Sequence, residues 1–186
     1  MAISIVSTVG SATANSYVTL TEAQAFIDGL TESDDVVAWG NSTEDQKNRA
    51  LFSSTRRIDR EKFLGAKASN TQARMWPRSG VRVPDQYTNL YGLSFPNRIL
   101  ADYYTDTEIP DEVKHAQIEL AVYLNNNKDG IGLSGLEDFA TMNVGNINIT
   151  PNFFGRVGVD RIPPIIDHYL IGLRIGGSAN LSIKRS

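Results

Sequence analysis

Residues Ser42–Lys62 read STEDQKNRALFSSTRRIDREK, and this stretch decides the fold class. A hydroxyl side chain at Ser42 or Thr43 can cap a helix, and two acidic residues follow in the first turn, where the helix dipole favours negative charge. The residues that then recur at helical spacing predict one buried stripe, formed by Leu51, Thr55 and Ile58. We therefore expect a helix that runs from this cap to about Lys62.

Two further helices are predicted, one on each side of this stretch. Thr19 and Glu22 have the spacing of a capping box, and a helix is expected over residues 20–30. Another begins at Pro110, because proline suits the first helical position, and ends near Asn125. The buried stripe predicted for this last helix consists of Val113, Ala116, Leu120, Tyr123 and Leu124.

The N-terminal segment, residues 1–16, has no helical pattern. Ile3, Ile5 and Val9 are separated by small polar residues in rough period two, which is typical of a strand or of a segment that pairs with another chain. We predict an extended N-terminal arm here. A frayed terminus fits the same residues.

The predicted core spans residues 17–127 and contains an irregular, tyrosine-rich insertion at 81–108. Residues 128–186 are expected to form a C-terminal arm, with a short strand at 144–149 and a short amphipathic helix that starts at Pro163. The predicted fold is thus mainly α, a small bundle of three main helices with two arms and one insertion. Both arms carry little apolar surface, so we expect them to become ordered only against sister copies or other proteins.

Five polar or aromatic residues outside the predicted stripes receive structural interpretations. Asp34 and Asp35 are expected in a solvated loop, because no base or further ligand accompanies them at a functional spacing. Trp39 and Trp76 are expected to fill the core. His115 lies beside the stripe of its helix and is expected to be a partly buried structural residue.

A local basic strip contrasts with the rest of the chain. Eight basic and four acidic residues lie between Glu44 and Arg74, which gives this stretch a net charge of +4. A solvated helix face with ion pairs such as Arg57–Glu61 explains the strip, and we favour this interpretation. The alternative is a surface that lines a DNA channel or meets another subunit, formed by Arg49, Arg56, Arg57 and Arg60.

The composition argues against several functional classes. The chain has 186 residues, no cysteine, two histidines and a formal net charge of −3. It is thus not generally basic, as a nucleic-acid-binding protein often is, and it has no thiolate ligand or nucleophile. Phosphate-loop, dinucleotide-binding, zinc-protease and nucleophile-elbow motifs are absent. We expect no enzymatic activity, cofactor, metal, secretory signal or membrane span.

Several stretches, in the same order, resemble one protein family. They are ANSYVTLTEA at Ala14–Ala23, TRRIDR at Thr55–Arg60, MWPR at Met75–Arg78, IPDEVKHA at Ile109–Ala116 and the helix at Pro164–Leu173. These stretches resemble the head–tail adaptors, or connectors, of the neck of tailed bacteriophages. Many members of that family are labelled DnaT-like single-stranded-DNA-binding proteins.

The resemblance implies a structural role in the virion. A small helical subunit would form a ring, with twelve copies, beneath the portal protein and would join it to the next neck or tail protein. DNA would pass through the lumen without sequence-specific binding. Such a protein would be assembled in the host cytoplasm and would reside at the head–tail interface of the particle.

Within this adaptor hypothesis, two sets of residues are predicted to contact other proteins. The C-terminal arm would clasp the portal through Ile165, Ile166, Tyr169, Leu170, Leu173, Arg174, Lys184 and Arg185. The insertion would meet the tail-side protein or a neighbouring subunit through Tyr87, Tyr91, Phe95, Tyr103 and Tyr104. Deletion of residues 162–186 is therefore expected to leave the helical core folded.

The alternative function is that of a single-stranded-DNA-binding accessory protein, as the family label suggests. Strand binding needs a positive groove with aromatic rings on which bases stack. The predicted basic helix has the charge, but its aromatic neighbours Phe52 and Phe63 are expected in the core. The sequence alone therefore favours the adaptor.

Overall fold

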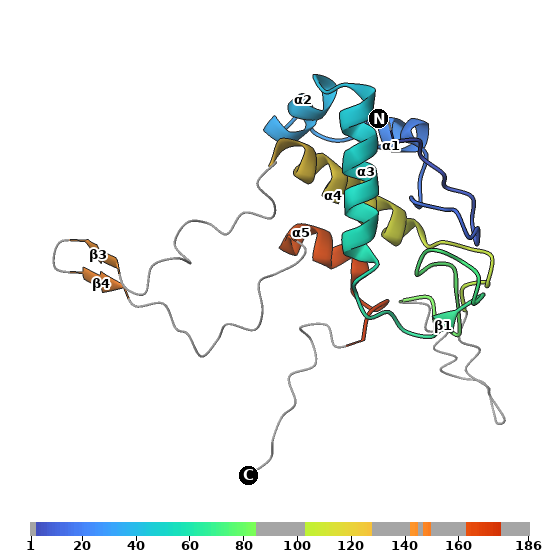
Figure 1. The fold of residues 1–186 in the computed structure, drawn as a ribbon. Helices are drawn as coiled ribbons and strands as arrows, with labels where there is room; N and C mark the ends of the chain where they lie inside the picture. Colours follow the sequence, from blue (N-terminus) through green and yellow to red (C-terminus); the bar gives the residue numbers. More distant parts are fainter. Residues whose placement is uncertain (1–2, 85–102, 128–141, 145–146, 150–162, 176–186) are drawn as a thin grey trace, which may run out of the picture.

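The computed structural model describes residues 3–84, 103–127, 142–144, 147–149 and 163–175, and this part of the chain is mainly helical (Figure 1). The prediction of a mainly α protein is confirmed. The helices are α1 (Leu20–Ile27), α2 (Asp34–Gly40), α3 (Glu44–Ile58), α4 (Asp111–Asn126), α5 (Pro164–Asp167) and the 3-10 turn η2 (His168–Leu170). Two short antiparallel pairs complete the described elements: β1 (Ala66–Lys67) with β2 (Arg78–Ser79), and β3 (Met142–Val144) with β4 (Ile147–Ile149).

Helix α4 is the central element of the fold. It packs against α1, α2, α3, α5 and η2, and α3 crosses it in Figure 1. Two apolar clusters share its surface. One contains Val113, Ala116 and Leu120 of α4 together with Trp76, Ile166, Leu170 and Leu173; the other contains Ile118, Ala121 and Val122 together with Trp39 and Leu51. Because α4 buries residues on several sides, it orders all the elements around it.

The predicted starts of α1 and α3 are confirmed, the start predicted for α4 is one residue early, and two predicted ends are too late. The Glu22 backbone N–H donates to Thr19 Oγ1 at 3.1 Å, and the Thr19 N–H donates to Glu22 Oε2 at 2.7 Å, which completes the capping box of α1. This helix ends at Ile27 instead of Leu30, since Asp28 takes the C-cap position. At α4, Pro110 is the N-cap residue and not the first helical residue.

Helix α3 also ends early, at Ile58 and not at Lys62. Asp59 takes the C-cap position, and its carboxylate accepts hydrogen bonds from the Tyr17 hydroxyl and, at 3.3 Å, from the Met75 backbone N–H. These tertiary contacts direct the chain away from the helix axis. The predicted buried stripe of α3 is confirmed, because Leu51, Thr55 and Ile58 are fully buried.

The interpretation of Asp34 and Asp35 as part of a loop is wrong. They form the first turn of α2, which Ser33 caps by accepting from the Val36 backbone N–H at 3.4 Å. Negative charge in a first turn is favourable for the reason that applies to α3. The helix has only seven residues, too few for a clear periodic pattern, and its one fully buried residue is Trp39.

The turn around Trp76 is packed, as predicted. Trp76 lies edge-on to the ring of Phe63, with the two ring centroids 5.5 Å apart, and it is 1% exposed. The neighbouring Arg78 guanidinium is turned inward, where it donates to the backbone carbonyls of Leu64 at 2.6 Å and Gly65 at 2.7 Å. Burial lowers the pKa of Arg78. The buried Arg78 side chain therefore helps to hold the segment between α3 and β2.

The C-terminal helix does not belong to a separate arm. Ile166 is 1% exposed, and Leu170 and Leu173 are fully buried in the cluster on α4. The backbone after η2 also pairs with the segment after α3, since the Leu64 N–H donates to the Leu173 carbonyl at 2.9 Å. The expectation that this region becomes ordered only against other proteins is wrong for residues 163–175.

The N-terminal segment is docked in the same way. The Asn48 side chain donates to the Ile3 carbonyl at 3.1 Å, and the Ala73 N–H donates to the Ser11 carbonyl at 3.0 Å. Residues 3–16 are therefore neither frayed nor a free arm, and they form no strand. The polar backbone of this segment bonds to α3 and to the loop before Trp76, which its apolar pattern did not indicate.

The remaining predictions are only partly covered by the structure. The strand expected at 144–149 is a hairpin of β3 and β4 in the described residues. The described ends of the insertion lie side by side, since the Tyr104 N–H donates to the Val81 carbonyl at 3.0 Å. Five predicted contact residues lie outside the described residues: Tyr87, Tyr91, Phe95, Lys184 and Arg185.

Candidate functional site

The basic strip of α3 is a surface feature. Arg49, Arg56 and Arg60 are exposed, and the intervals between them bring their side chains to one side of a helix. Arg60 lies just after α3, where its N–H donates to the Arg57 carbonyl at 3.1 Å and continues the helical turn. Arg57 is half-buried and lies further round the helix. Three arginines therefore share one face, which we call the α3 arginine face: Arg49, Arg56 and Arg60.

An aromatic ring borders the α3 arginine face. The Arg56 guanidinium lies over the ring of Phe52 at 5.7 Å from its centroid, and Phe52 is half-buried and not enclosed in the core. The sequence-based assignment of Phe52 to the core is thus wrong. A guanidinium beside a partly exposed ring offers a flat surface against which a nucleic-acid base can stack.

An acidic residue reduces the positive charge of this face at its N-terminal end. Arg49 Nε and Asp45 Oδ2 form an ion pair at 2.8 Å, and the Arg49 side chain is 56% exposed. This pair links residues one helical turn apart, as expected for a solvated helix. The predicted pair Arg57–Glu61 is not present among the described residues, because Glu61 pairs with Arg174 at 2.9 Å. The free positive charge therefore concentrates toward Arg56 and Arg60.

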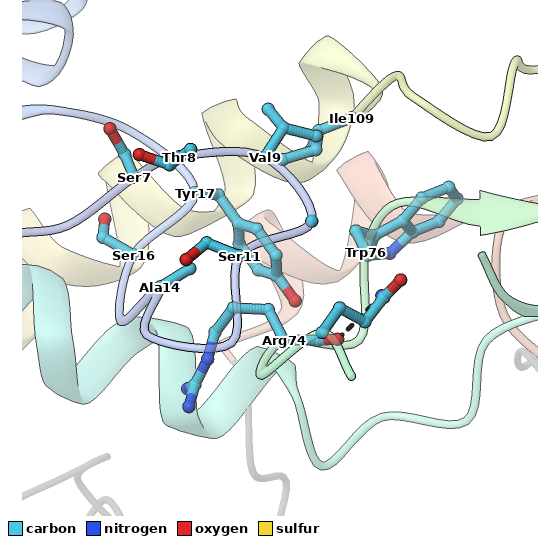
Figure 2. A pocket seen from close by; sticks show the side chains of 12 residues that line it. Ser7, Thr8, Val9, Ser11, Ala14, Ser16, Tyr17, Arg74, Trp76 and Ile109 are labelled. Carbon is cyan, nitrogen blue, oxygen red and sulfur yellow. Dashed lines mark hydrogen bonds between the residues drawn. The ribbon is translucent and has the colours of Figure 1, made fainter. Parts of the chain in front are cut away.

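A second polar cluster lies at the C-terminal end of α3. Asp59 accepts a hydrogen bond from the Tyr17 hydroxyl and pairs with Arg74, whose Nη1 lies 3.0 Å from Asp59 Oδ2. Figure 2 shows Tyr17 between Arg74 and the loop that carries Ser7 and Thr8. The space between these side chains holds no volume that a water molecule could occupy. The cluster is thus a closed seam that joins the N-terminal segment to the body.

Burial is the main cause of the pKa shifts of Asp59 and Tyr17 in this cluster. It raises the pKa of Asp59 above its ordinary value, although the Tyr17 hydroxyl, Arg74, Met75 and Lys67 all favour the carboxylate. Burial, followed by the nearby Asp59 charge, likewise raises the pKa of the Tyr17 hydroxyl. The carboxyl group of Asp59 is therefore more easily protonated in the folded chain than in the unfolded chain.

This shift predicts a pH dependence of stability. Because folded Asp59 binds its proton more tightly than unfolded Asp59, its contribution to the free energy of unfolding is largest below the ordinary pKa of 3.8. That contribution falls as the pH rises through the raised pKa. Urea unfolding of the wild type and of Asp59→Asn across pH 3–7 is expected to show a difference that changes in this window. A constant difference would contradict the prediction.

The predicted portal-contact residues lie in different environments in the structure. Ile166, Leu170 and Leu173 are enclosed in the core, so their prediction as contacts to the portal is wrong. Tyr169 donates to Glu119 at 2.6 Å, and Arg174 bonds to Glu61 and Asp167 within the chain. Ile165 lies in α5, and its side chain is not described.

The two described tyrosines of the insertion differ. Tyr103 is 59% exposed, so it is available to a partner. Tyr104 packs edge-on against Trp76 with centroids 6.3 Å apart, and burial, together with the nearby Glu112, raises the pKa of Tyr104 to about 12. Part of its ring thus packs within this chain, and because the residue is only partly buried, its role as a contact residue stays a prediction.

The described residues contain neither a metal-binding cluster nor a membrane-spanning helix. In that part of the chain, no three His, Cys, Asp or Glu side chains gather in a way that could hold a metal ion. His115 stacks on the ring of Phe26, with centroids 4.4 Å apart, in agreement with its structural interpretation. No described helix has the length and apolarity needed to cross a membrane.

The described residues define a mainly α-helical protein that carries an exposed basic surface, the α3 arginine face. The sequence profile of a family described as "Putative DnaT-like ssDNA binding protein" matches residues 1–186, and the chain belongs to this family. No curated protein and no solved structure matches the chain significantly. The family description names single-stranded DNA and does not mention head–tail adaptors.

Proposed function

We propose that the chain binds single-stranded DNA along the α3 arginine face. The main supporting observation is that the guanidinium of Arg56 lies over the partly exposed ring of Phe52, with exposed arginines on the same side of the helix. Arginines bind phosphates, and a ring of this kind accepts a base without reading its sequence. The description of the family supports this function over the adaptor.

The charge of the whole chain limits the affinity. The formal net charge is −3, and Asp45 neutralises part of the charge of Arg49. Binding should therefore be weak and strongly dependent on salt. Three phosphate contacts on a single strand correspond to a slope of about −2 in a plot of log affinity against log salt concentration.

The test is fluorescence anisotropy of a labelled oligothymidine titrated with the full chain at several salt concentrations. Arg56→Gln and Arg60→Gln are each expected to weaken binding about three- to tenfold and to reduce the salt slope, because each removes one phosphate contact. Phe52→Leu is expected to weaken binding with little change in slope.

Lys47→Gln provides a matched control. Lys47 belongs to the same helix but points to another side, where its Nζ lies 5.6 Å from the centroid of the Trp39 ring. The substitution removes the same charge from the chain, but Lys47 does not belong to the α3 arginine face, so the salt slope should stay unchanged. Equal losses in Lys47→Gln and Arg56→Gln would show that net charge, and not the α3 arginine face, governs binding.

The head–tail adaptor is a second candidate function, favoured by the ordered resemblance of the sequence stretches. In this proposal a ring of about twelve copies joins the portal to the next neck or tail protein, and the α3 arginine face lines the channel or meets a neighbour. Of the predicted contacts, Ile165, Lys184 and Arg185 remain proposals for the portal side. Tyr87, Tyr91, Phe95, Tyr103 and Tyr104 remain proposals for the tail side or a neighbouring subunit.

Light scattering of the full chain distinguishes the two candidates. One chain has a mass of 20.4 kDa, so a ring of twelve would have a mass of about 245 kDa. A ring that retains no oligonucleotide at moderate salt supports the adaptor. A smaller species that binds oligonucleotide with the expected salt slope supports the DNA-binding function.

A further inference from the structure

A groove lies beside α4 on the described surface and takes no part in the α3 arginine face. Its volume is about 310 Å³, and more of its surface is apolar than polar. Its apolar lining includes Val122 of α4 and Ile166 of α5. Leu30, in the loop before α2, and Val36, in α2, also line it. This volume is near the lower limit of about 300–1,000 Å³ that ligand pockets occupy, so it suits one large side chain with its neighbours.

Two carboxylates line the same groove. Asp35 Oδ1 accepts from the Asn126 amide at 2.6 Å, and Glu119 Oε1 accepts from the Tyr169 hydroxyl at 2.6 Å. Both donors are neutral groups. The hydrogen bond to Glu119 is the main cause that raises the pKa of Tyr169 to about 12. Both carboxylates are thus oriented, but their charge is not compensated by these contacts.

Among the described residues that line the groove, none carries a positive charge to balance these two. No lysine, arginine or histidine is among its lining residues, and in the described part of the chain neither Asp35 nor Glu119 forms an ion pair. An apolar floor with two negative groups is complementary to a ligand that combines an apolar group with a cation. A lysine or arginine beside an aromatic or branched aliphatic residue has this combination.

We propose that this groove binds a segment of a partner protein that presents an aromatic or aliphatic side chain next to lysine or arginine. The apolar side chain lies against the partly exposed Leu30 and Val36, and the cation lies near Asp35 and Glu119. Affinity comes mainly from the buried apolar group, and the two carboxylates select the neighbouring charge. This interaction is independent of DNA binding, so either can fail without the other.

The test uses the full chain, labelled with ¹⁵N, and three capped dipeptide amides as probes: acetyl-Phe-Arg, acetyl-Phe-Glu and acetyl-Gly-Arg. Chemical-shift changes are expected at the backbone of Val36 and Val122. Acetyl-Phe-Arg should bind at least about fivefold more tightly than each of the other two, which lack either the cation or the apolar group. Equal affinities, changes elsewhere on the chain, or no binding would overturn the proposal.

Charge-removing variants test the role of the carboxylates. Asp35→Asn combined with Glu119→Gln keeps a hydrogen-bond acceptor at both positions and is expected to reduce the preference for Phe-Arg over Phe-Glu to less than about twofold. Glu32→Gln is the matched control, because Glu32 is exposed near the groove but does not line it. Glu119→Gln alone, with its fold checked by circular dichroism, tests the same point if the double variant does not fold. An unchanged preference would refute the assignment.

Discussion

Removal of residues 162–186 is expected to unfold the helical body, contrary to the expectation from the sequence. This deletion takes away Ile166, Leu170 and Leu173, which are almost completely buried against α4. Each buried side chain of this size contributes about 1.5–3 kcal/mol. Their combined loss is comparable with the whole stability of about 5–15 kcal/mol that small proteins have.

The deletion also removes polar contacts that close the body. Arg174 pairs with Glu61 at 2.9 Å, and the backbone of Leu173 accepts from Leu64. Glu61 would lose its partner. We therefore expect the shortened chain to lose cooperative thermal unfolding and most of its helical circular dichroism.

A shorter deletion provides the control. Removal of residues 176–186 keeps Ile166, Leu170, Leu173 and Arg174, so we expect it to leave the melting temperature almost unchanged. The prediction fails if the chain without residues 162–186 unfolds cooperatively near the wild-type temperature. The packing of α5 and η2 on α4 would then not be needed for the fold, and the separate C-terminal arm predicted from the sequence would be supported.

Substitution of Gln117 is expected to have the next largest effect. Gln117 is fully buried in α4 and accepts from the Tyr17 backbone N–H at 3.0 Å. Its amide nitrogen lies 2.7 Å from Ser16 Oγ and 3.3 Å from the Leu51 carbonyl oxygen. One amide thus connects the N-terminal segment, α3 and α4.

Gln117→Leu is expected to lower the free energy of unfolding by about 2–3 kcal/mol. The leucine fills most of the volume, but it leaves the Tyr17 N–H buried without an acceptor, and an unsatisfied buried group costs about 1–3 kcal/mol. Gln117→Glu keeps the acceptor but adds a buried charge, so it should cost at least as much at neutral pH.

Urea unfolding measures this effect, and Asn126→Ala is the comparison. Asn126 also carries an amide on α4, but it is exposed, and its bond is to Asp35. Its loss should cost less than about 1 kcal/mol. Similar losses in Gln117→Leu and Asn126→Ala would mean that burial of the Gln117 network adds nothing to stability.

Local patterns predicted the long helices well. The cap at Thr19 and the acidic first turn after Thr43 mark the starts of α1 and α3, because both involve residues three or four apart. Helix α2 was not predicted, because its seven residues form less than two full turns. Ser33 followed by two aspartates was the available signal, and it has the same form as the cap of α3.

The candidate sites were predicted less completely. The exposed arginines could be found from composition and spacing, but the position of Phe52 at their border depends on how deeply α3 is packed. The groove could not be found at all, because its lining comes from α2, α4 and α5, which are distant in the chain. The sequence alone predicts Asp35 as loop surface, because no base or further ligand accompanies it at a functional spacing.

The sequence by itself determined the helical class, the starts of the three long helices to within one residue and the charge of α3, since these depend on neighbours within one or two turns. Only the tertiary structure decided that residues 3–16 and 163–175 belong to the body. An amphipathic stripe shows that a surface must be buried, but not against which partner. Helix α4 provides that partner within the same chain, because its apolar residues extend around more than one side.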